Sequence, residues 1–300
     1  MNGERKMICY HHNDLDGRCG AAIVLKKYPE CSMREIDYKD DPDFSKEVEL
    51  EEEVFIVDFS FTPEKMDELL TITGEESITW IDHHETVKDY KYECLPIEMK
   101  DGIKERWAIE FKGLRDFSQE CKKSGCELTW EYLFPSEPTP EAVRLIGDYD
   151  CWRFDTREET INFQFGMRSE HTDPRSVVWR AVFDGGNTLS RVQDTGKAVV
   201  NYKTNTSRKI MQNGYNIAFE GHTCFVVNTP GIDSGMFDLH ESKEEYGFFI
   251  SWVYLGHQYR VSLKSINQIN VAKIAQKYDG GGHKGAAGFV CDKLPWEERG

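Results

Sequence analysis

The 300-residue sequence lacks any apolar run long enough to span a membrane, and its first residues, MNGERKMICYHHNDLDG, contain no apolar signal-peptide core. It also lacks internal repeats and low-complexity segments. These absences argue against membrane, solenoid and disordered classes. We expect a globular cytoplasmic protein with no membrane partner.

Basic residues are scarce, because 37 Lys and Arg stand against 53 Asp and Glu and give a formal net charge of −16. A surface this acidic repels long polyanions, and the sequence shows no basic, aromatic-rich groove that could track a single strand. Any nucleic-acid partner is therefore expected to be short, and processive degradation of long strands is disfavoured. Carboxylates gathered around a cation would account for part of the acidic excess.

Cysteines are present but show no regular pairing. Their number is odd, and the closest pair, Cys121 and Cys126, has no second cluster with which to build a zinc site. We expect reduced thiols that serve as small hydrophobic residues or surface thiols, as in a cytoplasmic protein. The nine are Cys9, Cys19, Cys31, Cys94, Cys121, Cys126, Cys151, Cys224 and Cys291.

The first half of the chain alternates apolar runs of strand length with helical patterns. Strands are predicted at Met7–Tyr10, Val54–Asp58 and Ser77–Asp82, with helices over Cys19–Lys27 and Pro63–Leu70. This β-α-β alternation predicts an α/β fold whose parallel sheet carries helices on both faces.

Further helices are predicted around Ser124–Leu133 and Thr139–Asp148, and a long polar helix over Leu189–Gln212 suits a linker. Beyond Asn213 the pattern changes to short β-rich runs. These are Cys224–Asn228, Phe248–Tyr254 and Tyr259–Leu263, followed by a helix over Asn270–Lys277. We therefore expect a first domain over residues 1–185, a helical linker over 186–214 and a smaller α/β domain over 215–300.

Clusters of Asp and His follow the predicted strands. Ligands of open α/β sheets gather at the carboxyl ends of the strands, so these clusters are candidates for one site. They are His12, Asp14 and Asp16 after the first strand, Asp58 at the end of the second, and Asp82, His83 and His84 after the third. A fourth cluster, Asp148-Tyr149-Asp150, closes the helix that begins at Thr139.

Grouped carboxylates indicate a cation, because without one they would repel each other and raise their own pKa values. Carboxylate oxygens mixed with imidazole nitrogens suit Mn²⁺, with Mg²⁺, Co²⁺ or Zn²⁺ less preferred. Two ions would need a shared carboxylate, and Asp58 stands alone between the other clusters. A two-metal site of this kind activates water and stabilises charge on a phosphoryl group. Each Asp taken singly is more often a cap or turn residue, so the prediction depends on the grouping.

A glycine run near the C-terminus is the second strong signal. Gly280-Gly281-Gly282-His283-Lys284 lets the backbone approach a ligand, and its N–H groups could form an anion-binding nest. His283 and Lys284 would supply charge there. Lys264 is either a further positive contact or an exposed strand lysine.

Taken in order, the motifs resemble those of the DHH/DHHA1 phosphoesterase superfamily. They are His-x-Asp-x-Asp-Gly, an isolated Asp, Asp-His-His, another isolated Asp and Gly-Gly-Gly-His, and the first resembles the small oligoribonuclease (nanoRNase) branch. The resemblance covers nearly the whole chain. It implies a parallel-sheet DHH domain joined through a linker to a DHHA1 domain, with the active site in the cleft between them.

The resemblance also implies roles for individual residues. His12, Asp14 and Asp58 would hold one Mn²⁺, and Asp16, Asp58, His83 and Asp148 would hold the other. His84 would contact the scissile phosphate or act from behind the ligands, and Asp82 would orient a ligand. Gly280, Gly281, Gly282 and His283 would bind the substrate's phosphate or terminal nucleotide.

Two positions leave the assignment open. Either Asp148 or Asp150 could be the last metal ligand. We prefer Asp148 because it directly follows the apolar run Leu145-Ile146-Gly147. The strand that usually ends in Arg-Ser in the family reads Lys264-Ser265 here, and lysine keeps the charge but loses the bidentate fork.

The leading hypothesis is two-metal hydrolysis of short oligoribonucleotides to nucleoside monophosphates. Nucleoside bisphosphates (pAp) and linear or cyclic dinucleotides are alternative substrates. Pyrophosphate is less expected because the glycine-rich region resembles DHHA1. An inactive nucleotide-binding scaffold is disfavoured because no candidate ligand is missing from the motifs. The sequence leaves open whether the chain forms a homodimer.

Overall fold

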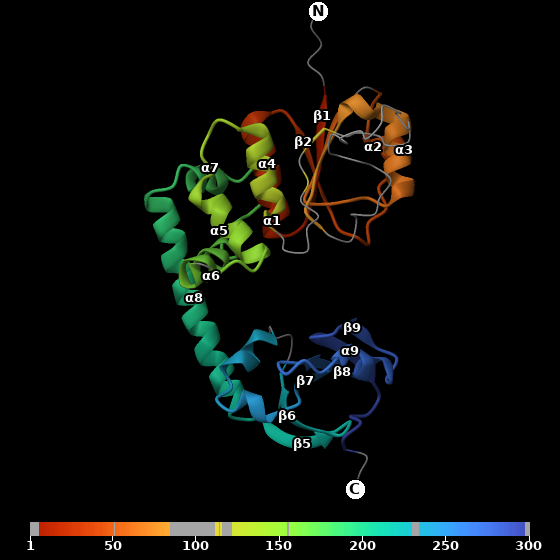
Figure 1. Cartoon of the computed structure of the whole chain (residues 1–300), viewed down its shortest axis with the longest axis vertical. Helices are drawn as coiled ribbons and strands as arrows, with labels where there is room; N and C mark the ends of the chain where they lie inside the picture. Colours follow the sequence, from red (N-terminus) through yellow and green to blue (C-terminus); the bar gives the residue numbers. More distant parts are fainter. Residues whose placement is uncertain are drawn as a thin grey trace, which may run out of the picture. The chain divides into compact units, whose positions relative to one another are not determined.

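The computed structural model describes residues 6–50, 52–84, 112, 113, 115, 122–154, 156–229 and 234–297. The chain divides into two compact units, Met1–Val199 and Val200–Gly300, and the division falls inside the long helix α8 (Asn187–Met211) (Figure 1). Helix α8 confirms the prediction of a long helix over Leu189–Gln212. Within the described residues, no helix combines the length and apolarity needed to cross a membrane.

Four parallel strands form the sheet of the first unit, in the order β2-β1-β3-β4. They span Met7–His12 (β1), Ser32–Ile36 (β2), Glu53–Val57 (β3) and Ile78–Ile81 (β4). Strands β1, β3 and β4 confirm the predicted runs. The sequence pattern misses β2, since its residues SMREI are mostly polar and only Ile36 is buried, as an edge strand permits.

Helices cover both faces of this sheet, as predicted (Figure 1). Cys9 and Val57 pack toward one layer, whereas Tyr10 and Ile56, their neighbours in sequence, pack toward the other. The strands are therefore apolar on both sides, as is usual for parallel sheets. The first layer contains α1 (Leu15–Lys27), α4 (Gly125–Leu133), α5 (Glu141–Asp150), α6 (Arg157–Met167) and α7 (Val177–Phe183), and the second contains α2 (Phe44–Glu47) and α3 (Pro63–Thr73), followed by the short η1 (Glu75–Ser77).

The carboxyl ends of β1, β3 and β4 meet at one edge, because the strands are parallel. His12 ends β1, while Asp58 and Asp82 directly follow β3 and β4. The backbone of Asp58 is left-handed, with φ of 54°, and its N–H donates to the carbonyl of Ile81 at 2.8 Å. A positive φ is uncommon outside glycine, and Asp is among the residues that tolerate it best. This turn fixes Asp58 to the end of the neighbouring strand.

The second unit is a six-stranded mixed sheet in the order β5-β6-β7-β8-β10-β9, in which only the β6–β7 pair is parallel. Its core includes Val226, Ile250, Leu263 and Ala275. The strands are β5 (Tyr215–Phe219), β6 (His222–Asn228), β7 (Phe248–Tyr254), β8 (Tyr259–Lys264), β9 (Gly281–His283) and β10 (Ala286–Cys291), with α9 (Val271–Gln276) and the short η3 (Ser234–Leu239) and η4 (Lys243–Glu245). The predicted strands and helix of this region are confirmed.

The glycine run forms an edge of this sheet. Gly281–His283 is the edge strand β9, antiparallel to β10. A Cβ on Gly280 would come within 2.2 Å of the carbonyl oxygen of Gly288, and one on Gly282 within 2.6 Å of that of Ala286. These two glycines therefore allow the backbone to pack closely against β10, a role that the sequence did not predict.

The cysteines differ in one respect from the expectation. Six described cysteines are free thiols, and all of these except Cys291 are buried. Cys151 is disulfide-bonded, which corrects the expectation of reduced thiols throughout. Cys94 and Cys121 lie outside the described residues.

Candidate metal centre

The turn between β1 and α1 brings His12 and Asp14 together. Asp14 caps α1, since its Oδ1 accepts the N–H of Gly17 at 3.0 Å, while its Oδ2 lies 3.0 Å from His12 Nδ1. Burial lowers the pKa of His12, but the carboxylates of Asp14 and Asp58 outweigh that effect and raise the pKa to about 10. The imidazole is thus held in a strongly anionic environment.

Asp16 reaches the start of a helix more than a hundred residues further along the chain. Its Oδ1 accepts hydrogen bonds from Ser124 Oγ (2.9 Å) and the Cys126 N–H (3.1 Å), and its Oδ2 accepts the Gly125 N–H (2.7 Å). The first N–H groups of a helix stabilise an anion in this way. Asp14 therefore caps the helix that it precedes, whereas Asp16 binds the start of α4, which packs against α1.

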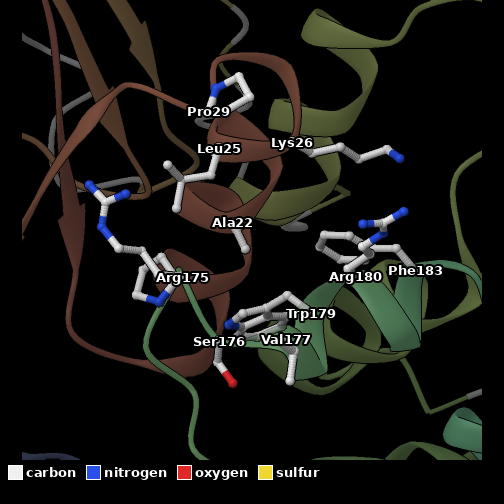
Figure 2. Close-up of a pocket in the computed structure, with 11 residues that line it drawn as sticks. Ala22, Leu25, Lys26, Pro29, Arg175, Ser176, Val177, Trp179, Arg180 and Phe183 are labelled. Carbon is white, nitrogen blue, oxygen red and sulfur yellow. The ribbon is translucent and has the colours of Figure 1, made fainter.

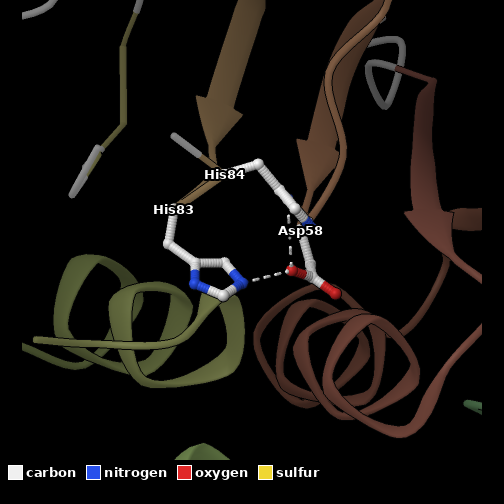
Figure 3. Close-up of side chains that lie close together, drawn as sticks. All are labelled: Asp58, His83 and His84. Atoms are coloured by element: carbon white, nitrogen blue, oxygen red, sulfur yellow. Dashed lines mark hydrogen bonds and ion pairs between the residues drawn. The ribbon is translucent and has the colours of Figure 1, made fainter. Parts of the chain in front are cut away.

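Asp58 is the buried centre of the site, with 1% of its surface exposed. Its Oδ1 lies 3.1 Å from His83 Nε2 and 4.0 Å from His84 Nδ1, and Figure 3 shows both histidines following β4 beside this carboxylate. Its Oδ2 lies 3.7 Å from His12 Nδ1. A Cβ on Gly125 would come within 2.5 Å of Asp58 Cβ. The glycine at the start of α4 therefore avoids a clash with the Asp58 side chain.

Two buried atoms at this centre, Asp58 Oδ2 and His12 Nδ1, have no hydrogen bond of acceptable geometry within the described residues, and His12 Nδ1 meets Asp14 and Asp58 only as ion pairs. Such atoms are rare in native proteins and costly. Burial, reinforced by the charges of Asp16 and Asp14, also raises the pKa of Asp58 well above its usual range. A cation between these atoms would relieve both costs.

The donor atoms form compact groups that could hold a metal ion. One group is His12, Asp14 and Asp58, another is Asp58, His83 and His84, and within each the ligand atoms lie within 4.8 Å of one another. Asp58 belongs to both groups. The mixture of carboxylate oxygen and imidazole nitrogen fits Mn²⁺ and similar divalent ions.

Asp82 orients the two histidines that follow it. It is fully buried, and its Oδ1 accepts the N–H of His83 at 2.8 Å and lies 2.7 Å from His84 Nδ1. The hydroxyl of Ser60, a residue that the sequence reading missed, donates to Oδ2. Burial raises the pKa of Asp82, but the hydrogen bonds from His84 and Ser60 and the charges of His84 and His83 together outweigh it, so the pKa is lowered and the carboxylate stays charged.

Asp150, at the end of α5, joins the Asp58 cluster. Its Oδ2 lies 3.3 Å from His83 Nε2. Burial, and then the charge of Asp16, raise the pKa of Asp150 to about 7, as expected for one carboxylate among several. The neighbouring Cys151 is disulfide-bonded and so offers no thiolate.

Asp148 has different partners. Its Oδ2 accepts Arg144 Nη1 at 2.6 Å and its Oδ1 accepts Arg153 Nε at 3.2 Å, while Arg153 also pairs with Glu127 at 2.7 Å. Residues two apart on an α-helix project about 200° apart, so Asp148 and Asp150 cannot face the same neighbours. The structure therefore brings Asp150 into the cluster and places Asp148 with two arginines.

The predicted substrate-binding residues of the C-terminal region lie in the second unit. Lys264 and His283 both pair with Ala286, from opposite sides of β10. Directly opposed residues of antiparallel strands share a face of the sheet, so these two side chains share one. Gly281, Gly282 and Lys284 are exposed beside them, whereas Gly280 is half-buried.

A cavity of about 540 Å³ lies apart from the candidate ligands (Figure 2). Ala22 and Leu25 of α1 line it from one side, and Trp179 and Phe183 of α7 from the other. None of the candidate ligands lines this cavity. The candidate active site is therefore the group of metal-ligand donors around Asp58, and not this cavity.

Comparisons with known proteins connect these features to a family. Residues 229–299 match the family model described as the DHHA1 domain. The chain is 24% identical over 260 residues to uncharacterized protein R106 of Acanthamoeba polyphaga mimivirus, covering 82% of this chain and 55% of that protein. It is 23% identical over 306 residues to oligoribonuclease NrnB of Bacillus subtilis, covering 93% and 71% respectively. The chain thus spans about half the length of the viral relative.

Two solved structures share the fold. The pGpG-specific phosphodiesterase PggH from Vibrio cholerae matches with a TM-score of 0.55 at 13% identity, covering 96% of this chain and 94% of that one. Exonuclease RecJ bound to manganese matches with a TM-score of 0.51 at 13% identity, covering 98% and 88%. The DHHA1 match over residues 229–299 and the similarity to oligoribonuclease NrnB support the resemblance to the DHH/DHHA1 superfamily that the ordered motifs from His12 to His283 indicate.

Proposed function

We propose that this chain is a Mn²⁺-dependent phosphodiesterase that hydrolyses short oligoribonucleotides to nucleoside monophosphates. The observation that carries the proposal is Asp58, a buried carboxylate shared by two groups of metal-ligand donors. The similarity to an oligoribonuclease supports the substrate, and the fold shared with a dinucleotide phosphodiesterase and a manganese-bound exonuclease supports the reaction class and the metal. The net charge of −16 disfavours long strands.

We assign one ion to His12, Asp14 and Asp58, and a second to Asp16, Asp58, His83 and Asp150. Asp150 takes the place that the sequence reading gave to Asp148, because two guanidinium groups already bind the Asp148 carboxylate. Mg²⁺ and Co²⁺ are the alternatives to Mn²⁺. When bound, such ions would lower the pKa of a water molecule and neutralise charge on the phosphoryl group.

The protein's own groups orient this chemistry. Asp82 holds Nδ1 of His84, whose ring can contact the scissile phosphate, and it fixes the backbone of His83. In the second unit we propose that the substrate's terminal phosphate is bound by Gly280–His283, Lys264 and Lys284.

A substrate panel tests the proposal. Purified protein with Mn²⁺ would be incubated separately with oligoribonucleotides of graded length, linear and cyclic dinucleotides, pAp and pyrophosphate. We expect the highest kcat/KM on the shortest oligoribonucleotides, with nucleoside monophosphates as products. Orthophosphate released from pyrophosphate, with no nucleotide hydrolysed, would refute the proposal, and turnover of pAp alone would make the protein a bisphosphate phosphatase. An Asp58→Asn variant controls for contaminating nucleases.

A further inference from the structure

Tyr38 is an exposed aromatic residue beside the donor cluster. Its ring centroid lies 5.5 Å from that of His12 and 6.1 Å from that of His84. It packs at 4.8 Å on Phe59, which is buried, whereas 57% of Tyr38 remains exposed. An aromatic surface therefore stands open to solvent directly next to the candidate ligands, a feature that the sequence reading did not single out.

The turn that carries Tyr38 is tied to the metal-binding loop. Asn13, between the candidate ligands His12 and Asp14, donates its Nδ2 to Asp37 Oδ2 at 3.2 Å. The other oxygen of Asp37 accepts the N–H of Tyr38 at 2.7 Å, and the N–H of Asp37 donates to Asp40 Oδ2 at 2.8 Å. Hydrogen bonds thus hold the backbone of Tyr38 beside the loop of His12 and Asp14, and its ring packs on Phe59.

A cavity of about 290 Å³ adjoins this ring, and Tyr38, Phe59 and Ser60 contribute to its lining. Its other polar groups are mostly carboxylates, from Asp40, Asp41, Glu64 and Glu68. The ammonium group of Lys65, the lysine of the lining, already lies 2.8 Å from Asp41 Oδ1 and 3.1 Å from Glu68 Oε2. A lining of this charge repels phosphate but accepts N–H donors, which nucleobases carry on their edges.

We infer that Tyr38 stacks on a nucleobase of the substrate, namely the base of a nucleotide whose phosphate lies at His12 and His84. The inference rests on the proposed function, in which His12 holds a metal ion and the ring of His84 contacts the scissile phosphate. The sugar joins base and phosphate over a short distance, so a phosphate at these histidines brings its base to the neighbouring ring. Stacking on an aromatic side chain accepts every base, because each base has a π-face. Tyr38 would therefore select nucleotides over other phosphate esters without selecting a sequence.

The test compares the parent with Tyr38→Ala, Tyr38→Phe and the control Tyr202→Ala, which removes a tyrosine that is 75% exposed on α8. The first readout is the ratio of kcat/KM for a dinucleotide to that for the same dinucleotide with both bases removed. The second is dinucleotide affinity with Ca²⁺ in place of Mn²⁺, so that binding is measured without turnover. Titration with Mn²⁺ alone shows whether loss of the ring has disturbed His12.

Tyr38→Ala is expected to lower the ratio about 5- to 150-fold, mainly through KM, with a similar loss of affinity in Ca²⁺. Tyr38→Phe should keep most of both, and Tyr202→Ala should match the parent. The inference is overturned if Tyr38→Ala keeps the parent's ratio and affinity, if Tyr38→Phe loses as much as Tyr38→Ala, or if only Mn²⁺ affinity falls. If the parent cleaves no phosphodiester, the proposed function fails, and the Ca²⁺ measurement still decides: affinity that depends on the ring supports the inference, and no binding by the parent refutes it.

Discussion

Two groups of carboxylates lie near the end of α5, and among the described residues arginine side chains neutralise only one of them. Asp148 is 6% exposed, and Arg144 and Arg153 neutralise it within the chain. Asp58 is buried just as deeply, but its neighbours are histidines and other carboxylates. A buried carboxylate balanced by arginine serves the fold, whereas an unbalanced group indicates a ligand that the chain does not supply.

Replacing the shared ligand should have the largest effect. Asp58→Asn keeps the shape of the side chain but removes the charge proposed to hold both ions. We expect kcat to fall by about 10³-fold or more, because a bound divalent ion supplies several kcal/mol of transition-state stabilisation. The variant should remain folded, since it also removes a buried charge. Steady-state kinetics and Mn²⁺ titration measure this, and full activity with parental Mn²⁺ affinity would contradict the assignment of the centre.

The comparison between the two groups is sharpened by a matched pair of variants on α5. Asp150→Asn should lower activity by about 10²-fold with little loss of stability, because it removes a proposed ligand. Asp148→Asn should instead lower the free energy of unfolding by about 1–3 kcal/mol, because it weakens charged hydrogen bonds to two arginines. Its activity should stay within a few-fold of the parent. Urea unfolding and kinetics on both proteins would show the reverse pattern if Asp148 were the ligand.

The smallest expected effect is on the pH dependence of stability without metal. The pKa of Asp150 is raised to about 7 in the folded protein, against about 3.9 for an unfolded Asp. Between these values the folded state binds more protons than the unfolded state, so the contribution of Asp150 to stability falls as pH rises through this window. In EDTA, the parent should lose more unfolding free energy than Asp150→Asn between about pH 4 and pH 7. Parallel pH profiles for the two proteins would show that Asp150 is not in the anionic cluster.

Local patterns predicted those elements whose sequence follows one rule. The buried strands β1, β3 and β4 are continuous apolar runs, and Thr62 with Pro63 marks the start of α3. The edge strand β2 was missed because its side chains are mostly exposed and carry no apolar run. One signal for Asp148 was readable in the sequence: Arg144 stands four residues before it on a predicted helix, a spacing that lets the two pair.

Other features of the site had no local signal. Asp16 accepts hydrogen bonds from Ser124, Gly125 and Cys126, and nothing near Asp16 in the sequence points to that helix. Ser60, in a loop, and Tyr38, in a turn, likewise carry no local signal until the fold places them beside Asp82 and His12.

The sequence by itself determined the parallel sheet, the order of the motifs and the chemical types of the donors, because apolar periodicity and residue identity are local properties. Only the tertiary structure decided which carboxylates meet. Helix geometry turns Asp150 toward His83 and Asp148 toward the arginines, and the packing of α4 on α1 brings Gly125 against Asp58. Electrostatic balance depends on distances between groups remote in sequence, and those distances exist only once the chain has folded.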